Sequence, residues 1–451
     1  MGDDTKVRKT LASRDEAFGR LEAFLPHAGG YANKRHVDLA GHPHVSGLSA
    51  HLRHRLILEE EVVARVYATW APHEVTKFIE EVCWRTYWKG WLEMHPSVWR
   101  HYRESVVRER SMLERDHALQ QRWMAAVEGR TGIDGFDHWA REVVETGYLH
   151  NHARMWFASI WIFTLRLPWS LGAAFFMRHL LDGDAASNTL SWRWVAGLHT
   201  VGKHYVACAD NIARHTQGRF HPRGQLDESP QPLTENAEEF PRVVLAALPT
   251  GTDACQPPLS ESPAGFLHTP EDLSPEIGAL ADAPFSSEAL FSVAAIDAEM
   301  GYTARVRAFQ RAAMDDAAAR AAVNWAGSVE ELSDVSDLSE RPPCGLHAGH
   351  AGARVYRGHV PNWEDAVVAW AMRENLRTVR CYRPPVGPWR DRLPKLREQL
   401  AQAGVALREY RRSWDALHWP HARTGYFRFK KKLGERLRDF VVEKPLHLEY
   451  H

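Results

Sequence analysis

The chain has 451 residues, of which 44% are hydrophobic and 25% charged. That length and composition predict a globular protein of two or three domains, and they argue against a transmembrane helix because no apolar run of about 18 residues occurs. The formal net charge of −1 neither requires nor excludes nucleic acid, since phosphate binding needs a local basic surface. The five cysteines form no CxxC pair and the start lacks a secretion signal, so we expect reduced thiols in a cytoplasmic protein.

Residues from about 10 to 220 are predicted to be helical. Apolar side chains recur every three or four positions in 59–67, in 74–84 and in 132–147, which is the period of an amphipathic helix. Gly147 is a predicted stop signal. Eighteen tryptophans in the chain fit either a large helical core or aromatic stacking surfaces.

The pattern changes after residue 225. Prolines recur from Pro222 to Pro263 among Ser, Thr, Asp and Glu, which predicts a linker. Beyond it, helices at 364–373 and 393–402 alternate with strands at 378–382 and 405–410, and a short strand is expected near 265–273. This alternation predicts a parallel sheet covered by helices. The segment 325–352 is rich in Ser, Glu and Gly and is expected to be a long loop.

The segments that carry chemistry lie in the helical part. Tyr31 and Arg35 precede Ser46 and Ser49, and serines at a helix start either cap it or present donors to a phosphate. Glu81 and Trp84 share one helix face, as a ligand-binding pair or as a salt bridge beside a buried indole.

A second group of polar residues follows. The run 148–156 (YLHNHARMW) places several polar groups within two helical turns among apolar neighbours, which favours a buried ligand site. In the run 181–194, Asp182, Asp184 and Asn188 fit two helices that meet at a polar cavity. A calcium loop is less consistent with this run because the closing glutamate is missing.

Together and in this order, these segments resemble the FAD-binding domain of the photolyase/cryptochrome superfamily, in particular that of cyclobutane pyrimidine dimer photolyases. The resemblance covers about residues 10–225 and implies an all-helical FAD-binding domain at 1–225. With the Pro-rich linker at 226–264 and a smaller Rossmann-like α/β domain at 265–451, both expected from the residue pattern, the predicted fold is mainly α. It implies that FAD is bound by Tyr31, Ser46, Leu48, Ser49, Arg85, Asn151, Arg154, Asp182, Asp184 and Asn188. Arg154 would pair with Asp182, and Asn188 would face the flavin N5.

The resemblance also implies a lesion pocket. Glu81, Trp84, Asn151, Met155 and Trp194 would contact a flipped pyrimidine dimer, with Glu81 on the thymine edges and the two indoles stacking. Asn151 points to the cyclobutane dimer, because photolyases for the (6-4) photoproduct place His there. Arg35 and His152 would contact DNA phosphates, although the family commonly has Arg at position 152, and Val45 and Gly47 replace its usual Thr and Arg.

Two tryptophans match the chain that photoreduces the flavin. Trp192 would be the inner member and Trp169 the middle one, while the region of the outer member is occupied by Arg110 and its neighbours. Tyr102 is one candidate to close the chain, and an impaired photoreduction is the alternative.

The expected activity is light-driven repair of cyclobutane pyrimidine dimers in DNA by a monomeric carbon–carbon lyase that uses FAD and needs no membrane. The alternatives are a blue-light photoreceptor with the C-terminal domain as its output, and a light-independent flavoenzyme. The resemblance leads us to expect a protein without the family's N-terminal antenna domain, since the helical domain comes first, and residues 265–451 resemble such a domain in permuted order or form an unrelated α/β domain. Cys344, His347 and His350 lack a fourth zinc ligand, so no metal is expected. Lys430, Lys431 and Lys432 fit a solvated helix face or a phosphate contact.

Overall fold

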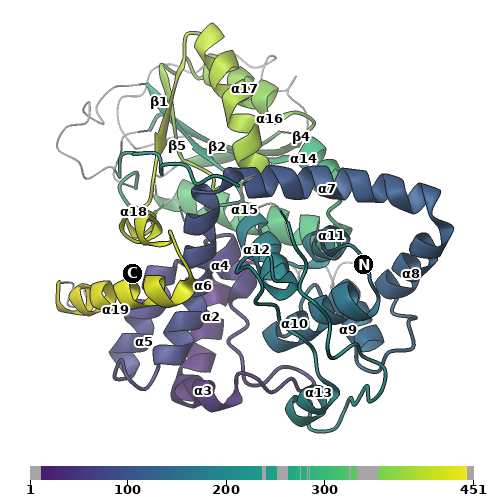
Figure 1. Cartoon of the computed structure of the whole chain (residues 1–451). Coiled ribbons are helices and arrows are strands. Elements are labelled where there is room, and N and C mark those ends of the chain that lie inside the picture. The colour runs from purple at the N-terminus through teal and green to yellow at the C-terminus, as the bar shows by residue number, and fades with distance from the viewer. Residues whose placement is uncertain are drawn as a thin grey trace, which may run out of the picture. The chain divides into compact units, whose positions relative to one another are not determined.

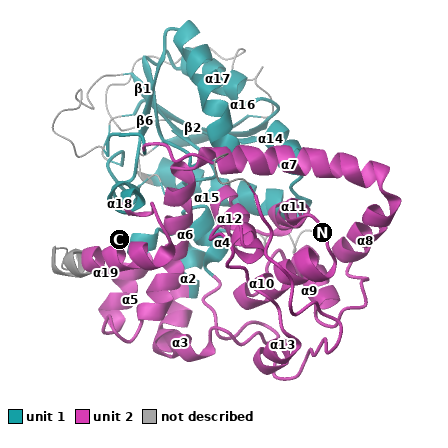
Figure 2. Ribbon diagram, in the orientation of Figure 1, with its two compact units in different colours: residues 1–20, 48–61, 245–420 teal, residues 21–47, 62–244, 421–451 magenta. Residues whose placement is uncertain are grey.

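The computed structural model describes residues 12–235, 240–250, 263–274, 276–281, 283, 285–324, 327–332 and 354–443. The chain divides into two compact units, each made of segments that are distant in sequence (Figure 2). The first unit comprises 1–20, 48–61 and 245–420, and the second comprises 21–47, 62–244 and 421–451. These boundaries differ from the expected breaks at 225 and 264, since two early segments join the α/β unit and the C-terminal segment joins the helical unit.

The first unit is built on a parallel sheet of six strands in the order β3-β4-β2-β1-β5-β6. Every pair in this sheet is parallel, as the alternation of helices and strands predicts. The strands are β1 (Ala264–His268), β2 (Ser287–Val293), β3 (Ser328–Leu332), β4 (Arg354–Val360), β5 (Thr378–Tyr382) and β6 (Ala406–Tyr410). Strand β3 lies inside the segment expected to be a loop, and β2 and β4 were not predicted.

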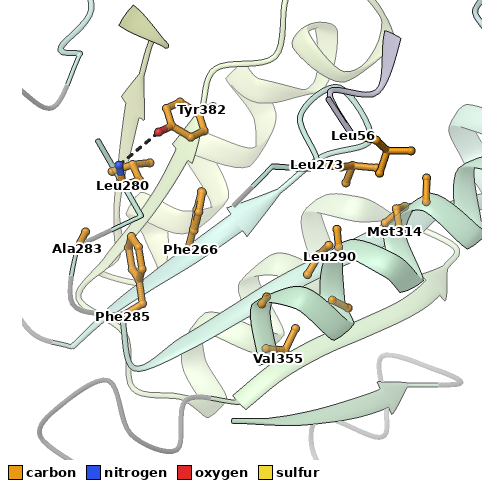
Figure 3. Packing of buried hydrophobic residues seen from close by; sticks show 14 of the residues in the cluster. Leu56, Phe266, Leu273, Leu280, Ala283, Phe285, Leu290, Met314, Val355 and Tyr382 are labelled. Atoms are coloured by element: carbon orange, nitrogen blue, oxygen red, sulfur yellow. Dashed lines mark hydrogen bonds between the residues drawn. The ribbon is translucent and has the colours of Figure 1, made fainter. Parts of the chain in front are cut away.

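Helices connect the strands and cover the sheet (Figure 1). They are α14 (Ala294–Met300), α15 (Ala304–Asn324), α16 (Trp363–Arg373), α17 (Pro388–Gln402) and α18 (Ser413–His418), with the short α4 (Ser49–Arg53) in the same unit. Phe266 of β1 packs with Leu290, Val355 and Met314 of α15 in one buried cluster (Figure 3). Because side chains alternate along a strand, the neighbouring Gly265 faces the other way, where a Cβ would come within 2.5 Å of Trp370 on α16.

A buried network of ion pairs connects three segments of this unit that are distant in sequence. Asp272 accepts from Nε of Arg412 at 2.6 Å and from Nη1 of Arg55 at 3.0 Å, and Arg55 also pairs with Asp415 at 2.7 Å. Burial opposes ionisation, but the two guanidinium groups lower the pKa of Asp272 to about 2. The carboxylate therefore stays charged because it is paired.

The second unit is helical. It contains α3 (Tyr31–Lys34), α6 (Thr76–Glu93), α7 (Pro96–Arg115), α8 (His117–Val127), α9 (Phe136–Thr146), α10 (Asn151–Ser159), α11 (Trp169–His179), α12 (Ala185–Ala196), α13 (Ala209–His215) and α19 (Tyr426–Glu443), while α2 (Arg14–Phe24) and α5 (Glu59–Thr69) are divided between the units. Gly147 ends α9 with a φ of 73°, as the sequence predicts. The core of the helical unit contains Trp139, Trp156 and Trp161, all fully buried. These tryptophans therefore contribute to packing.

The first part of the expected linker is anchored to the helical unit. Asp227 donates its N–H to Thr164 at 3.1 Å, and Leu233 donates to the carbonyl of Ala196 at 2.9 Å. Arg193, which is 3% exposed, forms an ion pair with Glu235. Residues 222–235 are therefore part of this unit, because their backbone and side chains satisfy its polar groups. No helix in the described part of the chain has the length and hydropathy needed to cross a membrane.

The network around Asp272 makes a stability prediction. Asp272→Asn leaves two buried guanidinium groups without a full counter-charge, so the free energy of unfolding should fall by about 3–5 kcal/mol. Urea titration followed by circular dichroism measures this change. The control is Glu331→Gln, which removes the partner of Arg357 at 3.2 Å where Glu331 is 76% exposed, and it should cost less than about 1 kcal/mol. Equal effects of the two variants would contradict the prediction.

Candidate functional site

Two buried arginine–aspartate pairs lie at the start of α12 in the helical unit. Asp184 caps this helix by accepting from the N–H of Ser187 at 2.7 Å, and it also pairs with Arg85 of α6. Arg154 of α10 lies 3.0 Å from Asp182, which is the pairing that the family resemblance implies. The side chains of Asp182 and Asp184 are only 5% and 3% exposed. Burying such charges costs desolvation free energy, and a polar ligand bound beside them would offset part of that cost.

The same cluster contains further polar groups. Arg154 lies over the ring of Tyr148 at 5.7 Å and donates from Nε to the carbonyl of Leu149 at 2.8 Å. Burial raises the pKa of Tyr148 well above its usual range, so the phenol stays neutral. Asn188, buried on α12, donates to the carbonyl of Ala173 at 2.8 Å. Its amide is therefore held in place and carries no charge at any pH.

Two buried polar atoms near this cluster have no hydrogen-bond partner among the described residues. They are Oγ of Ser187, between Asp184 and Asn188 on α12, and Nε2 of His150, which caps α10. Buried donors and acceptors are nearly always paired. The unmet groups fit a polar ligand lying beside the arginine–aspartate pairs.

Glu81 lies on α6 and Tyr31 on α3, which packs against α6. Glu81 forms an ion pair with Arg35, and Tyr31 packs edge-on against Phe78 with ring centroids 5.3 Å apart. Burial raises the pKa of the Glu81 carboxyl above its usual value, although Arg35 acts in the opposite direction. Arg35 is consequently engaged with Glu81 inside the unit, where it was expected to contact a DNA phosphate.

Trp84 is stacked on a residue that the sequence did not point to. Its indole is parallel to the ring of Tyr426 of α19, with centroids 3.5 Å apart and an interplanar angle of 9°. Tyr426 donates its hydroxyl to the carbonyl of Glu80 at 2.6 Å, and Lys430 pairs with Glu80 at 2.5 Å. These contacts fix α19 against α6. One face of the Trp84 indole is therefore already covered, and the only signal in the sequence was the aromatic and basic run 426–432.

The other expected substrate contacts come from α10 and α12. Trp194 stacks on Tyr205 at 5.9 Å, and the hydroxyl of Tyr205 lies 3.4 Å from Nε2 of His152. Met155 is half-buried and Asn151 is exposed at the first position of α10. Helix α12, which carries Trp194, packs on α6, which carries Trp84. The structure thus places the expected aromatic pair on two adjacent helices.

His152, which was expected to contact a DNA phosphate, is buried in the helical unit, and that role stays a prediction. It is 8% exposed, and its Nδ1 lies 3.1 Å from the carbonyl of His36. Burial lowers the pKa of His152 to about 4, so the ring is neutral near pH 7 and supplies no positive charge. His152 differs from an arginine at this position in two ways. Its ring is neutral, and its shorter side chain stays inside the helical unit.

The two tryptophans of the expected electron-transfer chain are buried on α11 and α12. Trp192 packs against Phe176 at 5.2 Å and Trp161 at 6.2 Å. Trp169 lies next to Tyr102 of α7, with ring centroids 5.8 Å apart. Tyr102 therefore lies beside Trp169, and its role in an electron-transfer chain stays a prediction.

The expected phosphate-binding residues are divided by the unit boundary. Ser46 belongs to the helical unit, whereas Leu48 and Ser49 begin α4 in the other unit. Their role as phosphate ligands stays a prediction. The cluster of Cys344, His347 and His350 lies outside the described residues.

Residues 78–225 match the family described as the FAD binding domain of DNA photolyase. The chain is 31% identical over 233 residues to a deoxyribodipyrimidine photo-lyase of Neurospora crassa, covering 49% of this chain and 37% of the relative. It is 36% identical to one of Streptomyces griseus, covering 37% of this chain and 34% of the relative. A cryptochrome DASH of Natronomonas pharaonis is 33% identical, covering 31% of this chain and 27% of the relative. The chain spans about a third of the length of these curated relatives.

The helical unit is thus a flavin-binding domain. It belongs to the photolyase/cryptochrome superfamily, and FAD is its cofactor. The arginine–aspartate pairs and the unmet polar atoms of Ser187 and His150 fit such a cofactor, which carries many polar groups.

Flavin retention should depend on Asp184. Asp184→Asn keeps an N-cap side chain but removes the charge opposite Arg85, so the purified protein should carry at least about tenfold less FAD, corresponding to ~1.4 kcal/mol or more. The ratio of flavin to protein absorbance measures this. Asp116→Asn is the matched control. Asp116 caps α8 by accepting from the N–H of Leu119 at 2.9 Å, and the described residues show no ion pair between it and an arginine. Loss of FAD in both variants, or in neither, would refute the assignment.

A second prediction concerns the pH dependence of stability. Burial disfavours a charged His42, but hydrogen bonds to Asp38 and Glu142 raise its pKa to about 9. The unfolded value is about 6.5, so this stabilisation is complete below that pH and is lost as pH rises through the folded value. His42→Asn should lower the free energy of unfolding by about 1–2 kcal/mol at acidic pH, after allowance for solvent screening.

The gap between the wild type and His42→Asn should close in alkaline solution, as followed by urea titrations from pH 6 to 9.5. The control is His138→Asn, since His138 lies 3.8 Å from the same Glu142 but is 47% exposed. A gap that is constant with pH would contradict a charged His42.

Proposed function

We propose that this protein is a light-driven flavoenzyme that repairs cyclobutane pyrimidine dimers in DNA, a deoxyribodipyrimidine photo-lyase. The observation that carries the proposal is that α6 and α12 hold Glu81, Trp84 and Trp194 in the same helical unit as the arginine–aspartate pairs. Bound FAD in its reduced form would supply an electron on absorbing light. The relatives named photo-lyases support this chemistry, although the chain matches only about a third of their length.

Glu81 would hold the lesion by its polar edge. Burial raises the pKa of its carboxyl while Arg35 opposes that shift, and the ion pair with Arg35 orients the side chain. A polar group that is already oriented toward the lesion acts on the charge that develops there without rearranging. The role proposed for Glu81 is thus electrostatic, and no side chain acts as a nucleophile.

The aromatic residues would hold the lesion by its faces. Tyr426 stacks on one face of Trp84 and fixes the indole, and because Trp84 is only partly buried, a base would contact the exposed part of its ring. Stacking contributes about 1–3 kcal/mol per base, and extruding a damaged base costs a few kcal/mol. Trp84 and Trp194 together would offset that cost, with Met155 and the exposed Asn151 completing the contacts from α10.

A blue-light photoreceptor is the second candidate. It is favoured by the neutral, buried His152 where the family commonly has a cationic arginine, and by the similarity to a cryptochrome DASH. In that case the α/β unit would serve as the output. Negligible affinity for dimer-containing oligonucleotide, together with a light-dependent change in proteolysis of the α/β unit, would favour this function over repair.

Glu81→Ala tests the repair proposal. We expect the number of dimers split per absorbed photon to fall at least about tenfold, while bound FAD and the melting temperature change little. Dimer loss is measured by absorbance recovery of an irradiated oligonucleotide under reducing conditions. Glu74→Gln serves as the control, since Glu74 is exposed before the same helix and bonds only the N–H of Ala71 at 3.1 Å among the described residues.

Two failures have separate meanings. A wild-type protein that retains FAD yet splits no dimers would refute the repair activity. Repair by the wild type with an unchanged yield in Glu81→Ala would leave the activity standing and refute the role of Glu81.

A further inference from the structure

Helix α19 has two faces of different character. Tyr426, Phe429, Leu433 and Leu437 are buried, and they follow one another at intervals of three or four residues, which is a single stripe along the helix. Tyr426 stacks on Trp84 and Phe429 packs on Tyr87 at 5.4 Å. This stripe fixes the helix to α6 inside the helical unit, next to the residues proposed to bind the lesion.

The opposite face of α19 is basic. Arg428, Lys432 and Arg436 are exposed and lie four residues apart, so they form a row with a spacing of about 6 Å along the helix axis. Lys431 flanks the row and is also exposed. From 421 to 437 the sequence has six lysines and arginines against the single acidic residue Glu435.

Few acidic side chains neutralise this face. Lys432 pairs with Glu435 at 2.8 Å on the surface, where such pairs contribute little. The described part of the chain records no ion pair for Arg428, Lys431 or Arg436. The positive charges of Arg436, Lys432 and Arg423 add to burial in lowering the pKa of His421, which places these cations around one point of the surface. A local positive potential is the requirement for phosphate binding.

An aromatic side chain borders the same face. Phe427 is 86% exposed and lies four positions before Lys431, on the turn that also carries Arg428. Aromatic rings that alternate with cations are the surface on which single-stranded nucleic acids bind, because bases stack on the ring while the cations follow the backbone.

We propose that the outer face of α19 is a DNA-binding surface, on which Arg428, Lys432 and Arg436 contact phosphates and Phe427 stacks on an unpaired base beside the lesion pocket. The proposal rests on the proposed repair function and extends it by naming where the DNA strand lies. This surface would supply the positive charge that His152 does not. The contact between Tyr426 and Trp84 would align this basic face of α19 with the proposed lesion pocket.

The test compares DNA affinity of the full-length, FAD-loaded protein and its variants by fluorescence anisotropy across a salt series. Arg428→Gln/Lys432→Gln/Arg436→Gln should weaken binding to a dimer-containing duplex by at least about 30-fold near 0.1 M salt. It should also reduce the slope of log affinity against log salt by about 2–3, since each lost phosphate contact removes about 0.9. Arg110→Gln/Arg115→Gln/Arg122→Gln removes three exposed cations of α7 and α8 and should change neither quantity appreciably.

Phe427→Ala should weaken binding to a single-stranded oligonucleotide roughly 5- to 100-fold and leave the salt slope unchanged, because no charge is lost. The control is Val107→Ala, an exposed apolar residue of α7 that is 66% exposed. Flavin absorbance and melting temperature, which should match the wild type in all four variants, exclude misfolding as the cause.

The outcomes separate this surface from the repair proposal. Wild-type protein that binds and repairs DNA, with an α19 triple variant that binds equally well, would overturn the surface and leave repair standing. A triple variant that loses affinity for phosphatidylserine vesicles but keeps its affinity for DNA would likewise overturn it. Wild type that neither binds nor repairs dimer-containing DNA would overturn both proposals.

Discussion

The site in the helical unit depends on the two buried arginine–aspartate pairs at the start of α12. Arg85 reaches Asp184 from α6, and Arg154 reaches Asp182 from α10. The two aspartates are deeply buried whereas the arginines are partly exposed, and buried carboxylates are tolerated only when they are paired, so the pairs require three helices to meet at one place. Asn188 lies one turn further along α12 and is held by the same packing. The start of α12 therefore organises the cluster that is proposed to bind the flavin.

A second constraint comes from the stacking of Trp84 on Tyr426. The indole and the phenol belong to segments separated by more than three quarters of the chain, yet they lie within one compact unit. The contact makes α19 part of the wall beside the proposed lesion pocket. It also determines which face of α19 is buried and which is left to solvent. A short-range aromatic contact is thus the link between the pocket and the basic surface.

The sequence predicted what depends on neighbouring residues. The helical period of 59–67, 74–84 and 132–147 matches α5, α6 and α9, and the strands at 378–382 and 405–410 match β5 and β6 to within a residue. Strand β2 was missed because a buried strand of a parallel sheet lacks alternation, and it carries Ser287 and Glu288 in its buried run. Glu288 is tolerated there because His268 lies 2.8 Å away, a partner that no local pattern reveals. Strand β4 is only partly buried, and its polar residues Arg354, Arg357 and His359 interrupt the apolar pattern.

The sequence by itself determined the chemistry available within single helices: Glu81 with Trp84, Arg154 with Met155, and Asp182 to Asn188. Spacing along a helix decides which side chains share a face, and those spacings are local. Only the tertiary structure decided the partners: Arg35 on Glu81, Tyr426 on Trp84, and His152 buried under Tyr205. The reason is that helical periodicity identifies the buried face of a helix but not the element that covers it, which is selected by packing over the whole unit.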